Sequence, residues 1–148
     1  MLLIIVPNII WARQKLKDYD PSGENKVLLV FERVGQVLCT ATVLFFRDYN
    51  PRGLEPWIVW LFASVALMIL YEIYWIRYFR SEQTVWDFYR SLWGIPAPGA
   101  TLPVAAFLLL GIYGKVIWLI ISSIILGIGH VGIHLQHINA LNGRKGSV

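Results

Sequence analysis

The sequence predicts an all-α polytopic membrane protein, a single domain over residues 1–148, with about five transmembrane helices and one amphipathic helix at the membrane surface. Hydrophobic residues make up 57% of the chain, which is too apolar for a soluble domain of 148 residues. Charged residues make up 15% and cluster between apolar runs, as expected when a bilayer excludes charge from spanning segments. The net charge of +4 favours anionic lipid over nucleic acid, because no nucleic-acid motif accompanies it.

Apolar runs define the predicted membrane helices. Crossing a hydrocarbon core about 30 Å thick takes about 20 helical residues. Three runs reach or approach this length, whereas the first and the fourth are short and depend on snorkelling of basic side chains or on local thinning of the bilayer. The helices are predicted at 1–14, 26–46, 57–79, 100–113 and 116–138, followed by a short basic tail at 139–148.

Lysine and arginine residues are unevenly distributed between the two sides of this predicted bundle. Nine of the thirteen lie in the loops and tail on one side and three on the other, and Arg33 lies within a helix. The positive-inside rule therefore predicts a multi-pass protein of the cell membrane with its N-terminus outside and its C-terminus in the cytoplasm.

The loop between the third and fourth predicted helices has a helical pattern of its own. Apolar residues in 82–93 repeat at i, i+3, i+4 and i+7, with Ser81 placed to cap the start and Gly94 placed to end the helix. This pattern predicts an amphipathic interfacial helix on the cytoplasmic membrane surface. The proline-rich stretch GIPAPGATLP that follows is expected to break the chain before the next helix.

Ionisable residues collect at the predicted cytoplasmic ends of three helices. Burying a charged side chain in hydrocarbon costs at least about 2.5 to 3.5 kcal/mol, so these residues are expected to face inward and pair around a polar cavity open to the cytoplasm. The alternative is that Glu32 and Arg33 simply reach the lipid headgroups. The predicted ligand-binding residues are Glu32, Arg33, Gln36, Tyr71, Glu72, Trp75, His130, His134, Asn8 and Trp11.

All three histidines lie on one predicted helix, at i, i+4 and i+7. His130 and His134 could hold one metal ion such as zinc, with Glu72 as a third ligand. The metalloprotease motif H-E-x-x-H fails, because Val131 stands where that motif has its glutamate. The alternatives are polar histidines that favour a helix C-terminus and a histidine that couples to protons near neutral pH. Haem is not expected, since its two axial ligands usually come from different helices.

The stretch GIGHVG also matches the glycine pattern of dinucleotide-binding loops. No strand precedes it and it lies in the body of an apolar helix, so no nucleotide is expected. Together with Ser123, these glycines instead predict a face of small residues that allows close helix packing.

The predicted function is the binding or transport of an amphipathic or lipid-like small molecule in the polar cavity. One alternative is an intramembrane lipid-modifying enzyme, possibly metal-dependent, with Glu72, His134 and Glu32 as candidate catalytic residues and His130 beside them. Another is a non-catalytic partner subunit whose polar residues only hold helices together. The expected partners are membrane lipids, the amphipathic ligand, and a second copy or another membrane protein.

Overall fold

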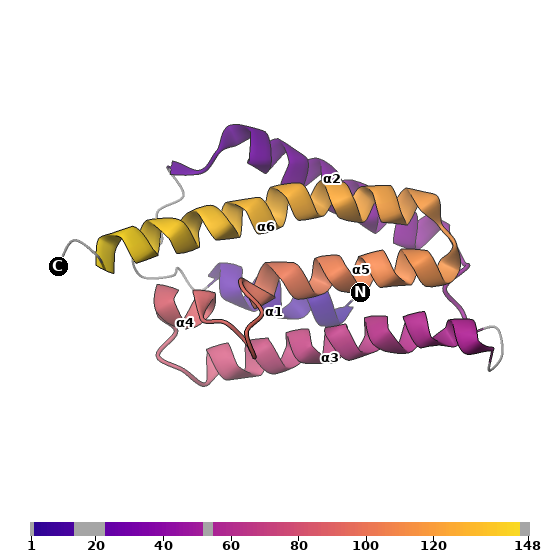
Figure 1. The fold of residues 1–148 in the computed structure, drawn as a ribbon, viewed down its shortest axis with the longest axis horizontal. Coiled ribbons are helices and arrows are strands. Elements are labelled where there is room, and N and C mark those ends of the chain that lie inside the picture. The colour runs from indigo at the N-terminus through magenta and orange to yellow at the C-terminus, as the bar shows by residue number, and fades with distance from the viewer. Residues whose placement is uncertain (1, 14–22, 52–54, 146–148) are drawn as a thin grey trace.

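The computed structural model describes residues 2–13, 23–51 and 55–145 (Figure 1). Throughout this part of the chain the long regular elements are helices, which confirms the predicted all-α class. A single 3-10 turn, Pro56–Ile58, leads into the third helix. The α-helices are α1 (Leu2–Arg13), α2 (Lys26–Phe45), α3 (Val59–Phe79), α4 (Val85–Tyr89), α5 (Pro98–Gly114) and α6 (Ile117–Lys145).

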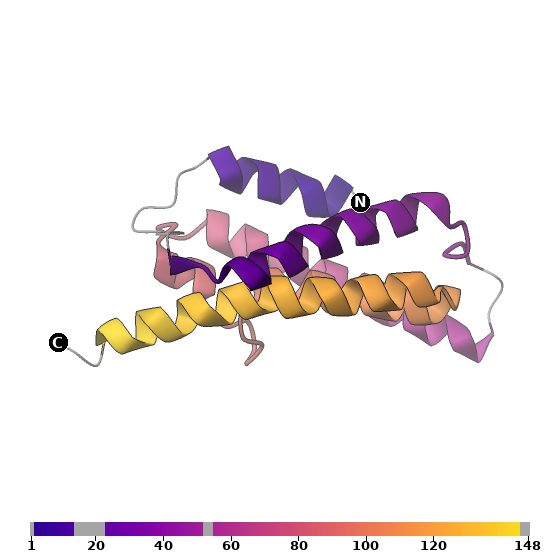
Figure 2. The ribbon, with the colours of Figure 1, turned by 90° about the horizontal axis from the view of Figure 1, so that it is seen from above.

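Four of these helices lie side by side in the order α2, α6, α5, α3 (Figure 1). Helix α1 lies on one face of this row, as the view from above shows (Figure 2). The start of α2, the end of α3, the end of α6 and all of α4 gather at one end of the bundle, which we call the α4 end (Figure 1).

Three helical stretches are long and apolar enough to cross a membrane: Lys26–Phe45, Pro56–Phe79 and Ile117–Gly143. Helix α5 is apolar but has 17 residues, a rise of about 25 Å. Helix α1 has 12 residues, a rise of about 18 Å. In the most apolar windows of α2 and α3 only 17% of the residues are buried, so most of their apolar side chains face outward, as lipid-covered helices require.

The ends of two elements differ from their prediction. Helix α6 continues to Lys145, so residues 139–145 extend the helix where a separate tail was predicted. Helix α4 spans only Val85–Tyr89 and is capped by Thr84, whose side chain accepts from Asp87 N at 3.1 Å. The prediction of a longer helix capped by Ser81 was wrong. The reason is that Gln83, at φ 57°, turns the chain just before the cap.

The apolar side of α4 faces the protein. Its side chains join α3 in a buried set of residues that we call the aromatic core. The aromatic core consists of Tyr71, Tyr74, Trp75, Tyr78, Val85, Phe88, Tyr89, Leu92 and Leu102. This apolar side therefore packs on the protein, where lipid was expected, and the location of α4 at the membrane surface stays a prediction. Periodicity identified the buried face of the helix but not what would cover it.

After α4 the chain makes a tight turn and then enters α5. Leu92 and Ile95 exchange backbone hydrogen bonds of 3.3 and 2.9 Å. The two residues between them, Trp93 and Gly94, both have positive φ, as a type I′ turn requires. Helix α5 then begins at Pro98, a position where the missing N–H of proline costs no hydrogen bond. The predicted break is therefore confirmed over 90–97, whereas the second half of the proline-rich stretch is helical and Pro103 lies inside α5.

Arg77 of α3 fixes the segment that follows α4. Its guanidinium donates from Nη1 to Ser91 O at 2.9 Å and from Nη2 to Arg90 O at 2.7 Å. The same group lies 5.6 Å from the centre of the Tyr74 ring. Tyr74 Oη in turn donates to Phe88 O at 2.9 Å. One turn of α3 thus holds three backbone carbonyls of α4 and the residues after it.

Replacing Arg77 with alanine is expected to loosen this segment. Two exposed hydrogen bonds are lost, which costs about 1 kcal/mol, and the fork geometry of the guanidinium cannot be supplied by a lysine. Trypsin should then cut after Arg90 several-fold faster than in the unchanged protein. Arg80→Ala, which removes an exposed arginine next to α3, is the control. Equal cleavage rates in the two variants would contradict the assignment.

Helices α2 and α6 approach each other closely at two glycines. A Cβ added to Gly129 would overlap the backbone nitrogen of Glu32 and lie 2.6 Å from Leu28 O. A Cβ added to Gly35 would overlap the backbone of Leu126. These positions tolerate no side chain, so each helix contributes a glycine to a backbone-to-backbone contact. The predicted role of the α6 glycines in close packing is confirmed.

Candidate functional site

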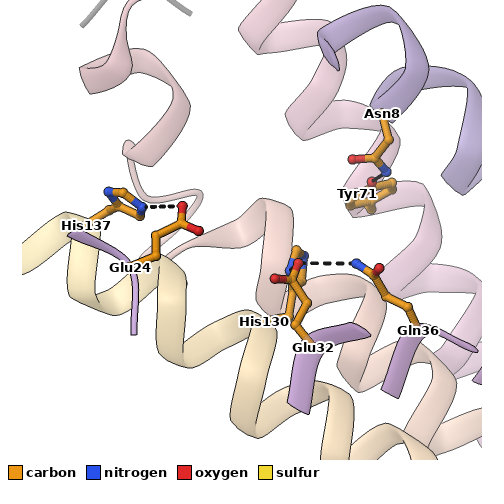
Figure 3. A network of polar contacts seen from close by, with 7 residues as sticks. All are labelled: Asn8, Glu24, Glu32, Gln36, Tyr71, His130 and His137. Carbon is orange, nitrogen blue, oxygen red and sulfur yellow. Dashed lines mark hydrogen bonds and ion pairs between the residues drawn. The ribbon is translucent and has the colours of Figure 1, made fainter. Parts of the chain in front are cut away.

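The α2–α6 contact places one carboxylate beside one histidine. Because Gly129 brings the two backbones together, Glu32 reaches the neighbouring His130, whose Nδ1 lies 2.7 Å from Glu32 Oε1 (Figure 3). Gln36, one turn further along α2, donates to the same oxygen at 3.2 Å. The two side chains of the ion pair are 23% and 14% exposed, so Glu32 meets a polar partner where water is scarce.

A second contact of the same kind lies at the start of α2. His137 Nε2 is 3.0 Å from Glu24 Oε1 (Figure 3). Beside it, Gln136 Nε2 donates to Gly23 O at 2.6 Å, and Gln136 Oε1 accepts from Asn25 N at 3.2 Å. The last turns of α6 therefore bind both the residues before α2 and the helix itself.

His134 lies between these two contacts and is surrounded by rings. Its imidazole centre is 5.6 Å from the rings of Phe88 and Tyr89 and 4.7 Å from that of His130. Tyr89 also stacks on His137 at 5.8 Å. The histidines of α6 thus connect the α2 contact to α4 and to the aromatic core.

The other predicted ligand-binding residues lie apart from the histidines or inside the core. Arg33 is exposed and, within the described ranges, forms no ion pair with Glu32 or Glu72. Glu72 is half-buried on α3, and its Oε1 is buried without a hydrogen-bond partner among the residues described. The charge of Arg33 favours ionised Glu32 without a direct ion pair, whereas no contribution from Arg33 reaches Glu72.

Helix α1 attaches to the bundle through two of the predicted residues. Asn8 Nδ2 donates to Tyr71 Oη at 2.7 Å (Figure 3). Trp11 stacks on Phe88 with ring centres 5.1 Å apart. Tyr71 and Trp75 are 1% and 3% exposed and belong to the aromatic core. These four residues serve packing in the structure, where a cavity lining was predicted.

A metal site is not assembled from the candidate ligands. Across the described ranges, no three His, Cys, Asp or Glu side chains converge as a metal would require. His130 is engaged by Glu32, and His134 is in ring contact with α4. The set His130, His134 and Glu72 therefore does not form the tetrahedral arrangement that zinc prefers.

A groove of about 330 Å³ opens at the α4 end, between α4 and the last turns of α6. None of the ten predicted ligand-binding residues lines it, although Tyr89 connects it directly to His134 and His137. Its walls combine three large apolar side chains with a cation, an anion, an amide and a phenol. They are Trp86, Asp87, Tyr89, Arg90, Ile138, Leu141 and Asn142.

No protein family, no curated protein and no solved structure matches this chain. The binding properties of the groove therefore follow only from the residues that line it.

The acidic and phenolic groups of the groove have defined protonation states. Burial opposes ionisation of Asp87, but hydrogen bonds from Thr84 outweigh it, so the pKa of Asp87 lies below its usual value. Burial, and then the charge of Glu24, raise the pKa of Tyr89. At neutral pH the groove therefore contains a carboxylate and a protonated phenol. The Tyr89 hydroxyl can donate a hydrogen bond to a ligand.

The groove was not predicted, because the last predicted helix ends at residue 138 and the groove needs the turn after it. Ile138 and Leu141 continue the spacing of His134 by four and seven residues, which is the signal for one more helical face. Following that spacing would have extended α6 and placed an apolar wall opposite α4. The cation Arg90 carries no such signal, because its position depends on the turn that ends α4.

Proposed function

We propose that this chain is a five-span protein of the cell membrane with its N-terminus outside and the α4 end in the cytoplasm. The bias of lysine and arginine in the sequence supports this orientation. The start of α2 and the ends of α3 and α6 lie together at the α4 end, which supports this orientation, because the basic residues at these helix ends then share one side (Figure 1). Helices α1 and α5 would span by local thinning of the bilayer around them.

We further propose that the protein binds an amphipathic, lipid-like small molecule in the groove between α4 and α6. The observation that carries this proposal is the mixed wall of the groove. Trp86, Ile138 and Leu141 offer apolar surface, and Arg90 and Asn142 lie beside them. Ligand sites of this size typically combine apolar walls with a few polar groups that orient the ligand. The site lies outside the predicted polar cavity, while the ligand class is the one predicted.

The histidines favour a structural role over a catalytic one. His130 and His137 are each held by a carboxylate from α2 or the residues before it, and His134 is enclosed by rings. An enzyme would need at least one of these groups directed at a substrate. Their contacts instead connect α6 to α2 and to α4, and so support the wall of the groove.

Filling the groove with a larger side chain is expected to weaken lipid binding strongly. In Leu141→Trp the larger ring occupies the space between α6 and α4, so affinity for a short-chain phospholipid should fall at least about tenfold, equivalent to about 1.4 kcal/mol. Native mass spectrometry of the protein purified in detergent measures the bound lipid directly. Thermal unfolding of the same sample checks that the variant is folded.

Leu135→Trp is the matched control for this experiment. Leu135 lies on the same helix, is 39% exposed and is not part of the groove. It should leave lipid binding unchanged. If folded Leu141→Trp binds phospholipid as well as the control does, the groove is not the ligand site. Co-purification of the unchanged protein with a stoichiometric membrane protein, and with no lipid, would favour the partner-subunit alternative.

A further inference from the structure

The charged groups of the groove are not equally available to a ligand. Asp87 Oδ2 accepts from Thr84 N at 3.2 Å and from Thr84 Oγ1 at 2.9 Å. In return Thr84 Oγ1 accepts from Asp87 N at 3.1 Å. This reciprocal capping box uses the carboxylate to hold the start of α4. A cationic ligand would have to compete with that cap.

Arg90 lies at the other end of α4, and its side chain is not held by hydrogen bonds as the Asp87 carboxylate is. Its backbone oxygen accepts from Arg77, but its guanidinium is exposed and, within the part of the chain that the structure describes, has no hydrogen bond or ion pair. Asp87 attracts it across three residues without forming an ion pair. Five N–H donors are therefore available beside the apolar walls.

Neutral donors in the groove complement Arg90. Tyr89 is protonated at neutral pH and its hydroxyl donates to no acceptor in the described ranges. Asn142, on the opposite wall, adds an amide that can donate two hydrogen bonds. A guanidinium, a phenol and an amide suit the oxygens of a phosphate. The charge of Arg90 also repels the trimethylammonium group that accompanies the phosphate of a zwitterionic headgroup.

We infer that the groove selects phospholipids whose headgroup carries a net negative charge, with the phosphate at Arg90 and an acyl chain against Trp86, Ile138 and Leu141. This inference rests on the proposed lipid-binding function and specifies which class of lipid the groove binds. The source of the phosphate is a membrane lipid, because the apolar walls would have no use for a free inorganic anion. Arg90 lies at the α4 end, where basic residues of the bundle meet the headgroup region.

The test compares two lipids that differ only in headgroup. Dioleoylphosphatidylglycerol and dioleoylphosphatidylcholine are offered in equal amounts to the full-length protein in a non-ionic detergent, and native mass spectrometry counts each. The unchanged protein should bind the anionic lipid about tenfold more tightly, and Arg90→Gln should bind both about equally. Arg90→Lys should keep part of the preference, because it keeps the charge but loses the fork.

Arg80→Gln is the matched control, since Arg80 is an exposed arginine near the same end but outside the groove. It should keep the full preference. If Arg90→Gln and Arg80→Gln reduce the preference for the anionic lipid equally, the preference comes from the general positive charge of the surface and not from a specific site. The inference then fails. Competition by millimolar inorganic phosphate would also overturn it, because the site would then recognise a free anion. If Leu141→Trp removes lipid while Arg90→Gln does not change the preference, the proposed function stands and only the headgroup inference fails.

Discussion

Gly129→Ala is expected to destabilise the protein more than any other single-methyl change described above. The added Cβ would overlap the backbone nitrogen of Glu32 and crowd Leu28 O, so α2 and α6 would have to move apart as rigid bodies. Such overpacking typically costs about 1 to 3 kcal/mol and more where backbone is the obstacle. Because Glu32 and His130 are joined across the same contact, their hydrogen bond should lengthen as well. Thermal unfolding in detergent micelles measures the loss.

Gly143→Ala is the control, and its expected effect on thermal stability is neutral or opposite to that of Gly129→Ala. Gly143 also lies on α6, but nothing lies within 4 Å of a Cβ added there. Alanine forms helix better than glycine by up to about 1 kcal/mol, so Gly143→Ala should leave the melting temperature unchanged or raise it. A Gly129→Ala protein as stable as Gly143→Ala would show that α2 and α6 do not pack as described.

Separating Glu32 from His130 is the second change with a large expected effect. His130→Ala leaves a carboxylate that is 14% exposed with Gln36 as its remaining neighbour. Losing a hydrogen bond to a charged group costs about 1.5 to 3 kcal/mol, and Glu32→Ala should cost less, because it removes the more buried carboxylate and leaves an imidazole that is 23% exposed. Unfolding of both single variants and of the double variant gives the coupling energy, which should be about 1 to 3 kcal/mol.

An apolar replacement of both partners checks the interpretation. When two polar partners are exchanged together for apolar side chains of similar size, the stability change can be close to neutral. Glu32→Leu combined with His130→Leu should therefore be more stable than His130→Ala alone. A coupling energy of zero would mean that the two groups do not interact.

Helix content was predictable because it follows from local patterns. The apolar runs that became α2, α3 and α6 are long enough that their length alone indicates membrane helices. Close packing by the glycines of α6 was predictable for the same reason, since several small residues share one stretch. Gly35, the partner glycine on α2, shares the buried face of that helix with Cys39 and Thr42, four and seven positions further on. This spacing of small residues is the signal that could have predicted the α2 side of the contact.

The candidate site was harder to predict because adjacent residues on a helix point in different directions. Glu32 and Arg33 differ by about 100° around the helix axis. When Glu32 faces α6, Arg33 faces away from it, so the two could not both join one cavity. Which of them turns inward depends on where α6 crosses, and that position is set by residues about a hundred positions later in the chain.

The pairing of α2 with α6 has a consequence for biosynthesis. Glu32 and His130 are 98 residues apart, and ribosomes add about 5 to 20 residues per second, so α2 waits roughly 5 to 20 s for its partner. During this interval the nascent α2 has a carboxylate and a bare glycine surface without the helix that covers them. The contacts of α2 are therefore complete only after α6 has been synthesised.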